Sequence, residues 1–156
     1  MSDTTQSRPV VPTAAPEDVN RRRLTRDERD EMLSRPIVAV FSSLAAGGWI
    51  HSVPVHFLYR DGEIRILCGT SSVKASNVDR TGRGTLCVEV THGSERRYVT
   101  VEGAVRVERP ARPDDVTALD QQYSRTDTAN WTESDYTGEA MLVMRPTRWL
   151  AWSDWD

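Results

Sequence analysis

The sequence predicts a mainly β-fold with helical inserts, in which six or seven short strands form a barrel-like sheet. Apolar and polar residues alternate over much of the chain after Ile37. This period of two residues is typical of a half-buried strand. Turn signals that contain glycine separate these stretches at residues 45–48, 60–63 and 92–95. Helical spacing is confined to short segments, so we expect a closed β-sheet with helices inserted between its strands.

The N-terminal region is predicted to be a flexible arm over residues 1–22, followed by a single domain over residues 23–156. The arm contains prolines among serine, threonine and alanine, a composition that does not build a core. The remaining length is typical of one domain. Thr25, with Glu28 three residues later, forms a capping-box pattern, which predicts a short helix that Pro36 ends.

The later elements are predicted from alternating apolar runs and from the proline and glycine residues between them. Strands are expected at residues 37–42, 49–59, 64–68, 86–91, 98–108, 140–144 and 149–155. Short helices are expected at residues 73–80 and from Asp114, as the N-cap, to about Tyr123. Residues 124–138 are polar and irregular, and Pro146 is expected to turn the chain between the last two strands.

Composition and charge argue against several classes of function. A net charge of −3 and a pI near 5.6 give no electrostatic basis for binding nucleic acid. No apolar run approaches the ~20 residues that cross a bilayer, and no signal-peptide pattern is seen, so we expect a cytoplasmic protein that does not enter membranes. Cys68 and Cys87 lie in apolar strands and are expected to be reduced. The three histidines show no metal-ligand spacing, so no metal site is expected.

The most distinctive residue is Lys74, because it is the only lysine among the 20 basic residues of the chain. It follows Thr70, Ser71 and Ser72 at the predicted start of a helix, and Asn77 lies about one turn later. Backbone N–H groups, hydroxyl groups and a flexible ammonium group can together bind a phosphate. The alternative is a polar loop that caps a short helix, with Lys74 as a solvated surface residue.

Four short motifs occur in a characteristic order around this lysine. They are Ser52-Val53-Pro54-Val55-His56-Phe57, Asp61-Gly62, Thr70-Ser71-Ser72-Val73-Lys74-Ala75-Ser76-Asn77-Val78 and Val99-Thr100-Val101-Glu102-Gly103. In order and spacing they resemble the split β-barrel flavin-binding superfamily of the pyridoxamine 5′-phosphate oxidases. The branch they resemble most comprises small flavin- or deazaflavin-dependent oxidoreductases of actinobacteria. The resemblance spans residues 36–108, with a weaker likeness over 141–152, and implies that the predicted sheet is a split β-barrel.

The resemblance also implies a homodimer with two cofactor sites in grooves between the subunits. By position, the residues expected to contact the cofactor are Ser52, Pro54, Val55, Thr70, Ser71, Ser72, Lys74, Asn77 and Trp152. Lys74 and Asn77 match the turn that holds the cofactor phosphate in such proteins. Ser52, Pro54 and His56 match the strand that faces the tricyclic ring. Such a ring needs a dry, flat wall and a fixed phosphate anchor, while the ring itself does the chemistry.

His56 is the candidate catalytic residue, since a histidine can protonate a substrate near neutral pH after hydride transfer. The alternative is a polar strand residue that is paired across the sheet. Tyr123, Trp131 and Tyr136 belong to the polar insert, which is a natural place for a substrate lid. The tryptophans of the last strand are expected at the dimer interface, with Trp152 partly lining the cofactor site.

The run from Arg21 to Arg23 has two interpretations. It is a solvated part of the arm, or it contacts the anionic glutamyl tail of a deazaflavin. The chain ends in Trp149-Leu150-Ala151-Trp152-Ser153-Asp154-Trp155, where the pyridoxamine phosphate oxidases carry an arginine-rich substrate signature. This difference does not favour a vitamin B6 substrate.

The function that the resemblance favours is an oxidoreductase that uses reduced F420 to transfer a hydride to an activated C=C bond of an enone-type substrate. A tetracycline-like intermediate of antibiotic biosynthesis is one such substrate. The first alternative is an FMN-dependent oxidoreductase of the same fold, since both cofactors have a phosphate and a similar ring. The second is a non-catalytic protein that binds a flavin, F420 or a tetrapyrrole.

Overall fold

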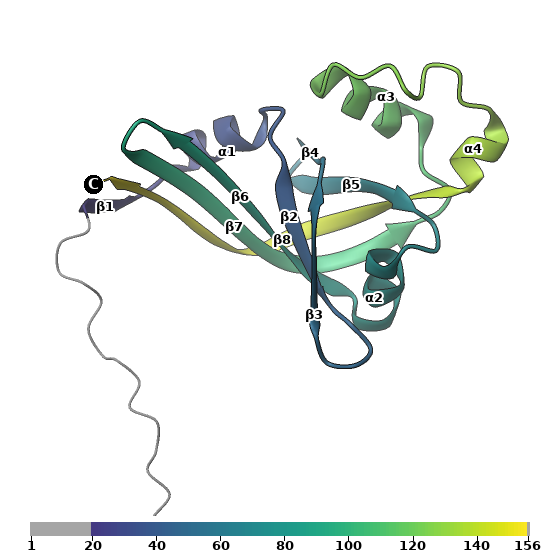
Figure 1. The fold of residues 1–156 in the computed structure, drawn as a ribbon, viewed down its shortest axis with the longest axis horizontal. Helices are drawn as coiled ribbons and strands as arrows, with labels where there is room; N and C mark the ends of the chain where they lie inside the picture. Colours follow the sequence, from purple (N-terminus) through teal and green to yellow (C-terminus); the bar gives the residue numbers. More distant parts are fainter. Residues whose placement is uncertain (1–19, 156) are drawn as a thin grey trace, which may run out of the picture.

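One curved antiparallel sheet of eight strands organises the computed structural model, which describes residues 20–155 (Figure 1). The strands are β1 (Asn20–Arg23), β2 (Ala39–Leu44), β3 (Ile50–Val55), β4 (Leu58–Arg60), β5 (Glu63–Gly69), β6 (Arg83–His92), β7 (Glu95–Glu108) and β8 (Glu139–Trp155). The helices are α1 (Arg26–Leu33), α2 (Val73–Thr81), α3 (Pro113–Gln122) and α4 (Glu133–Thr137). The strand order is β3-β2-β6-β7-β8-β5-β4, and β1 pairs with β8. The mainly β-fold with helical inserts, of the split-barrel type, is confirmed with one strand more than the largest expected number.

The last strand, β8, is a continuous element of 17 residues rather than two strands with a turn at Pro146. Proline has no N–H to donate to a β-ladder, and Pro146 is accommodated opposite Gly103, where the register between β7 and β8 shifts. A Cβ atom on Gly103 would lie 2.2 Å from the backbone oxygen of Arg145. The register shift therefore depends on a glycine at position 103. Because β8 continues through the shift, it pairs with β5 in its first half and with β1 near its end.

The stretch predicted as a single strand over residues 49–59 is divided into β3 and β4. The division falls at His56 and Phe57, whose backbone is not bonded to a neighbouring strand. The N–H of Phe57 donates to the hydroxyl of Tyr123 at 3.1 Å, and its carbonyl accepts from the side-chain amide of Gln122 at 3.0 Å. The end of α3 thus replaces a strand as the hydrogen-bonding partner of this segment.

Several predicted boundaries in the other elements need correction. Strands β6 and β7 each begin three residues earlier than predicted, and the stretch predicted to be irregular over residues 124–138 contains α4. Helix α3 has Arg112 at its N-cap and Pro113 at its first position, so Asp114 lies in the first turn and is not the cap. Residues 20–22 are part of β1, which pairs with the end of β8, so they do not belong to a flexible arm. Residues 1–19 lie outside the described part of the chain.

The capping signals in the sequence are confirmed. Thr25 accepts from the N–H of Glu28 at 3.2 Å, and the Glu28 carboxylate accepts from the N–H of Thr25 at 2.8 Å. Ser72 caps α2, and Gly82 ends it in the left-handed conformation with φ of 65°. These contacts satisfy N–H groups that have no partner within the helix.

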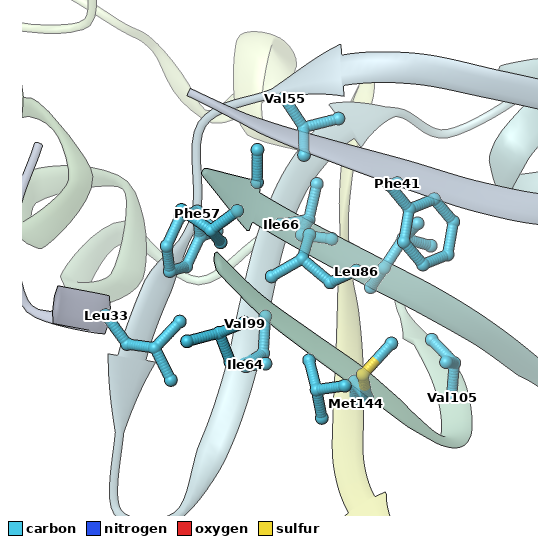
Figure 2. Packing of buried hydrophobic residues seen from close by; sticks show 14 of the residues in the cluster. Leu33, Phe41, Val55, Phe57, Ile64, Ile66, Leu86, Val99, Val105 and Met144 are labelled. Carbon is cyan, nitrogen blue, oxygen red and sulfur yellow. The ribbon is translucent and has the colours of Figure 1, made fainter. Parts of the chain in front are cut away.

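The core is formed by two apolar clusters on opposite faces of the sheet. The larger one includes Phe41, Phe57, Ile64, Ile66, Leu86, Val99 and Met144, several of which are shown in Figure 2. The smaller one packs Val116 and Leu119 of α3 against Met141 and Val143 of β8. Successive β8 residues point to opposite faces, so the strand is buried on both faces here. Helix α3 is therefore fixed over this end of the sheet, where it positions residues beside β3.

An ion-pair network also holds α3 in place. Asp115 is 2% exposed and contacts Arg60 of β4 at 2.7 Å and Arg65 of β5 at 2.9 Å. A buried carboxylate needs such partners, because removing its charge from water is costly. In residues 20–155, no helix is both long and apolar enough to cross a membrane.

Candidate functional site

A pocket of about 330 Å³ lies between strand β3, the start of α2 and the end of α3. Pro54, Val55, His56 and Lys74 all line it, so the structure brings together four of the residues predicted from sequence. Apolar side chains from β5, α3 and the insert complete the wall, among them Leu67, Leu119 and Trp131. A larger hollow of about 530 Å³ lies over β2, β6 and β7, but none of the predicted site residues lines it. The smaller pocket is therefore the candidate site.

Lys74 is the second residue of α2 and is half-buried at the edge of this pocket. The N-terminus of the helix carries a partial positive charge, to which the ammonium group adds. Among the described residues, no carboxylate lies within ion-pair distance of Lys74. This cation is thus available to a ligand, whereas many arginines of the protein are paired with acidic side chains.

The other residues of the predicted phosphate cradle make contacts within the protein. Asn77 is 3% exposed, and its amide donates to the hydroxyl of Ser43 in β2 at 3.1 Å. The hydroxyl of Thr70 accepts from Arg109 at 2.8 Å. The hydroxyl of Ser72 caps α2 by accepting from the N–H of Ala75 at 3.4 Å. None of the three lines the pocket, nor does the exposed Ser71.

Ser52 and Trp152 also lie away from the pocket. The hydroxyl of Ser52 shares a hydrogen bond of 2.8 Å with that of Ser42 on the outward face of the β2–β3 hairpin. Trp152 lies near the end of β8, where the guanidinium groups of Arg21 and Arg23 lie 4.2 Å and 5.1 Å from its ring. The arginine run is thus bound to the domain, and Trp152 has an intramolecular role.

His56 lies on the pocket wall, between the end of β3 and the start of β4. Its ring stacks on Tyr123, with centroids 4.0 Å apart and an angle of 14° between the planes. Its Nδ1 lies 3.2 Å from Nη1 of Arg125. Burial, and then the charge of Arg125, lowers the pKa of His56 below its ordinary value of 6.5. The imidazole is therefore mostly neutral at pH 7.

Glu139 is a carboxyl group in the same pocket that sequence reasoning missed. It is the first residue of β8 and is half-buried. Burial raises the pKa of Glu139, and the charge of Lys74 opposes this effect only in part. Its position before an apolar strand resembles that of many turn residues, so the sequence contains no signal that would have identified it.

Of the three aromatic residues expected near a lid, Tyr123 and Trp131 line the pocket and Tyr136 does not, and Arg125 is a further pocket residue from this insert. The ring of Trp131 packs edge-on against Tyr136, with centroids 5.3 Å apart. Sequence reasoning assigned no role to Arg125, because its contact with His56 joins positions far apart in the chain.

The fold is that of a split-barrel protein, and its candidate site is a pocket beside the only lysine of the sequence. Residues 25–153 match the pyridoxamine 5′-phosphate oxidase family, and the chain belongs to this family. The comparison with curated proteins gave no match.

Solved structures share the same fold. An F420 reductase aligns with a TM-score of 0.65 and 19% identity, covering 78% of this chain and 94% of that one. A putative 5-nitroimidazole antibiotic resistance protein from Bacteroides thetaiotaomicron aligns with a TM-score of 0.73 and 10% identity, covering 87% and 89%. An FAD-binding protein from Mesorhizobium loti aligns with a TM-score of 0.65 and 17% identity, covering 88% and 99%. At these identities the likeness concerns the fold.

Proposed function

We propose that this protein is an oxidoreductase that uses reduced F420 to reduce an activated C=C bond of an enone-type substrate. The observation that carries the proposal is the pocket in which Lys74 lies opposite the Pro54–His56 segment of the sheet. Family membership supports a cofactor with a ring and a phosphate, and the fold shared with an F420 reductase supports F420 in particular. The substrate class follows from the resemblance of the sequence motifs.

The residues present fit such a group. A volume of about 330 Å³ is within the range of small-molecule sites. Pro54 and Val55 provide an apolar wall for a flat ring, and Lys74 provides a cation for a phosphate. Glu139 would repel a phosphate when ionised; burial raises its pKa, and the charge of Lys74 acts in the opposite direction. The group itself would supply the hydride.

The residues of the chain then have separate tasks. Lys74 would hold the phosphate and so orient the ring beside the β3 residues of the pocket. Pro54 and Val55 would provide an apolar surface for the ring, and Trp131 with Tyr123 would help to exclude water from the pocket. His56, which lines the same pocket, would contact the reacting part of a substrate bound beside the ring.

We also propose that the protein is a homodimer whose subunits complete each other's sites. Large apolar residues are exposed on the β2–β3 hairpin, where Ile50 of β3 is 66% exposed and Trp49, in the turn before it, is 79% exposed. Val40 pairs with Pro54 across the hairpin, so this exposed surface continues to the pocket. An exposed apolar surface next to a ligand site is typical of an interface. The aromatic end of β8 is already covered, since Arg29 lies 3.9 Å from the ring of Trp149.

Titration with F420 and, separately, with FMN tests the proposal directly. Fluorescence reports binding, and the oxidation of reduced F420 is then followed with cyclohexenone as a simple enone. We expect F420 to bind at least tenfold more tightly than FMN and to be oxidised only when the enone is present. Tighter binding of FMN would make the protein an FMN enzyme, and binding without turnover with a panel of enones would make it a carrier.

A further inference from the structure

The ring of His56 is held from two sides by residues that follow helix α3. Tyr123 stacks against one face, and its hydroxyl is bonded to the backbone of Ile37 and Phe57. Arg125 contacts Nδ1 at 3.2 Å. Because Tyr123 is itself fixed, neither neighbour leaves the imidazole free to rotate about its side-chain bonds.

The contact with Arg125 determines which nitrogen of His56 carries a hydrogen. A guanidinium group has only donors, so Nδ1 must be the acceptor. A neutral imidazole that accepts at Nδ1 carries its hydrogen at Nε2. No described residue forms a hydrogen bond with Nε2, so this donor is free for a ligand.

The other charged groups around the pocket do not change this assignment. Lys74 comes from α2, Asp120 from α3 and Glu139 from β8, and all three line the pocket with His56. Of these charged groups and Arg125, only Arg125 contacts the imidazole, and its charge contributes, after burial, to the lowered pKa of His56. The nearest charge thus opposes formation of the imidazolium ion.

We propose that His56 acts as a neutral Nε2–H hydrogen-bond donor to a carbonyl oxygen of the substrate, and that Arg125 is the positioning residue that selects this tautomer. The assignment of the tautomer stands on the geometry alone, whereas the carbonyl partner rests on the proposed function. This donor role of His56 replaces the general-acid role expected from the sequence, because a neutral Nε2–H group does not readily give up its proton.

The chemistry of an enone explains why a fixed donor is useful. When a hydride from the reduced deazaflavin adds to the β-carbon, the C=C π-bond breaks and its electron pair moves toward the carbonyl oxygen. That oxygen becomes an enolate oxygen, and the Nε2–H group of His56 stabilises its charge without transferring a proton. A proton from water then adds to the α-carbon, which restores the carbonyl and completes the reduction.

The tautomer can be observed in the protein without cofactor by ¹⁵N NMR of the histidine side chains. The chain has three histidines, and the His56→Gln variant identifies the signal of His56. We expect the Nε2–H form in the natural protein, loss of this preference with a rise in the pKa of His56 in Arg125→Ala, and its retention in Arg125→Lys. Arg26→Ala, which removes an exposed arginine of α1, serves as the matched control. An Nδ1–H form, or no change in Arg125→Ala, would overturn the proposal.

Turnover of reduced F420 with an enone tests the carbonyl partner. Glutamine places an N–H donor near the position of Nε2, whereas asparagine places one near Nδ1. We expect His56→Ala and His56→Asn to lower kcat about 100-fold and His56→Gln to remain within about tenfold of the natural protein. Equal losses in all three variants would contradict donation from Nε2. Failure of F420 to bind would overturn the proposed function and leave the NMR result intact.

Discussion

The hydroxyl group of Tyr123 donates a hydrogen bond of 2.8 Å to the backbone carbonyl of Ile37. The same oxygen accepts from the N–H of Phe57 at 3.1 Å. Ile37 precedes β2 and Phe57 follows β3, so one side chain at the end of α3 joins both ends of the β2–β3 hairpin. This bond connects the polar insert to the strand that carries the pocket residues.

Replacing Tyr123 by phenylalanine should therefore destabilise the protein. The change leaves two backbone groups without a partner, which costs about 1–3 kcal/mol of unfolding free energy. Urea unfolding measures this loss, with Tyr136→Phe as the control, since the Tyr136 hydroxyl makes no hydrogen bond among the described residues. Equal stability of the two variants would show that solvent replaces the bonds of Tyr123.

Lys74→Ala should weaken cofactor binding about ten- to a hundredfold, because a charge-assisted contact with a phosphate contributes about 1.5–3 kcal/mol. The unfolding midpoint should change little, since Lys74 makes no ion pair with the described part of the chain. Titration with F420 gives the affinity, and Lys74→Arg, which keeps the charge, should lose less. An unchanged affinity in Lys74→Ala would rule out the phosphate contact.

Gly103→Ala should destabilise the fold by about 1–3 kcal/mol, the usual cost of an overpacked site. The new Cβ would lie 2.2 Å from the backbone oxygen of Arg145, and backbone atoms of a long strand cannot easily move away. Gly69→Ala is the matched control, because nothing lies within 4 Å of a Cβ at that position. Thermal unfolding of both variants measures the difference, and similar melting temperatures would mean that β8 can shift.

The capping box of α1 should make stability depend on pH in the acid range. The hydrogen bond from Arg22 and the bond from the N–H of Thr25 lower the pKa of Glu28 from 4.5 to about 2. A lowered pKa means that the unfolded chain binds more protons between these values, so stability falls as the pH falls through this window. Urea unfolding of the natural protein and of Glu28→Gln should differ most above pH 4.5 and converge toward pH 2. A constant difference would contradict the lowered pKa.

Ile50→Glu should shift the protein from dimer toward monomer. Ile50 is 66% exposed on the outward face of the β2–β3 hairpin, and burying a carboxylate against an apolar partner is costly. Light scattering at micromolar concentrations measures the mass, with Ser94→Glu in the exposed β6–β7 turn as the control. A monomer in the natural protein would exclude the proposed dimer.

Local signals in the sequence predicted much of this structure, because they act between near neighbours. The Thr25–Glu28 box and the Asp61-Gly62 turn involve contacts within a few residues, and the structure contains both elements. Pro54 and His56, which were matched to the strand that faces the ring, both line the pocket, and so does Val55 between them. The strand at Pro146 was predicted wrongly, because its continuity depends on Gly103, a partner distant in sequence.

The site was predicted in part for the same reason. Lys74 and Asn77 lie three positions apart on a helix, which separates their side chains by about 60° around its axis. That rotation places Lys74 at the pocket and Asn77 against Ser43. The position of β2 determines whether Lys74 or Asn77 points toward the pocket. No local pattern in the sequence contains that information. The contact between Arg125 and His56 is likewise a product of the tertiary structure.

The isolation of Lys74 has a practical consequence, because it is the only side-chain amine in the 156 residues. An amine-directed acylating reagent can attach only one tag to the side chains of each chain, at the edge of the pocket. A ligand whose phosphate covers this amine would block the tag. The fraction of tagged protein, read by mass spectrometry of the intact chain, would then report occupancy of the pocket for colourless compounds as well as for fluorescent ones.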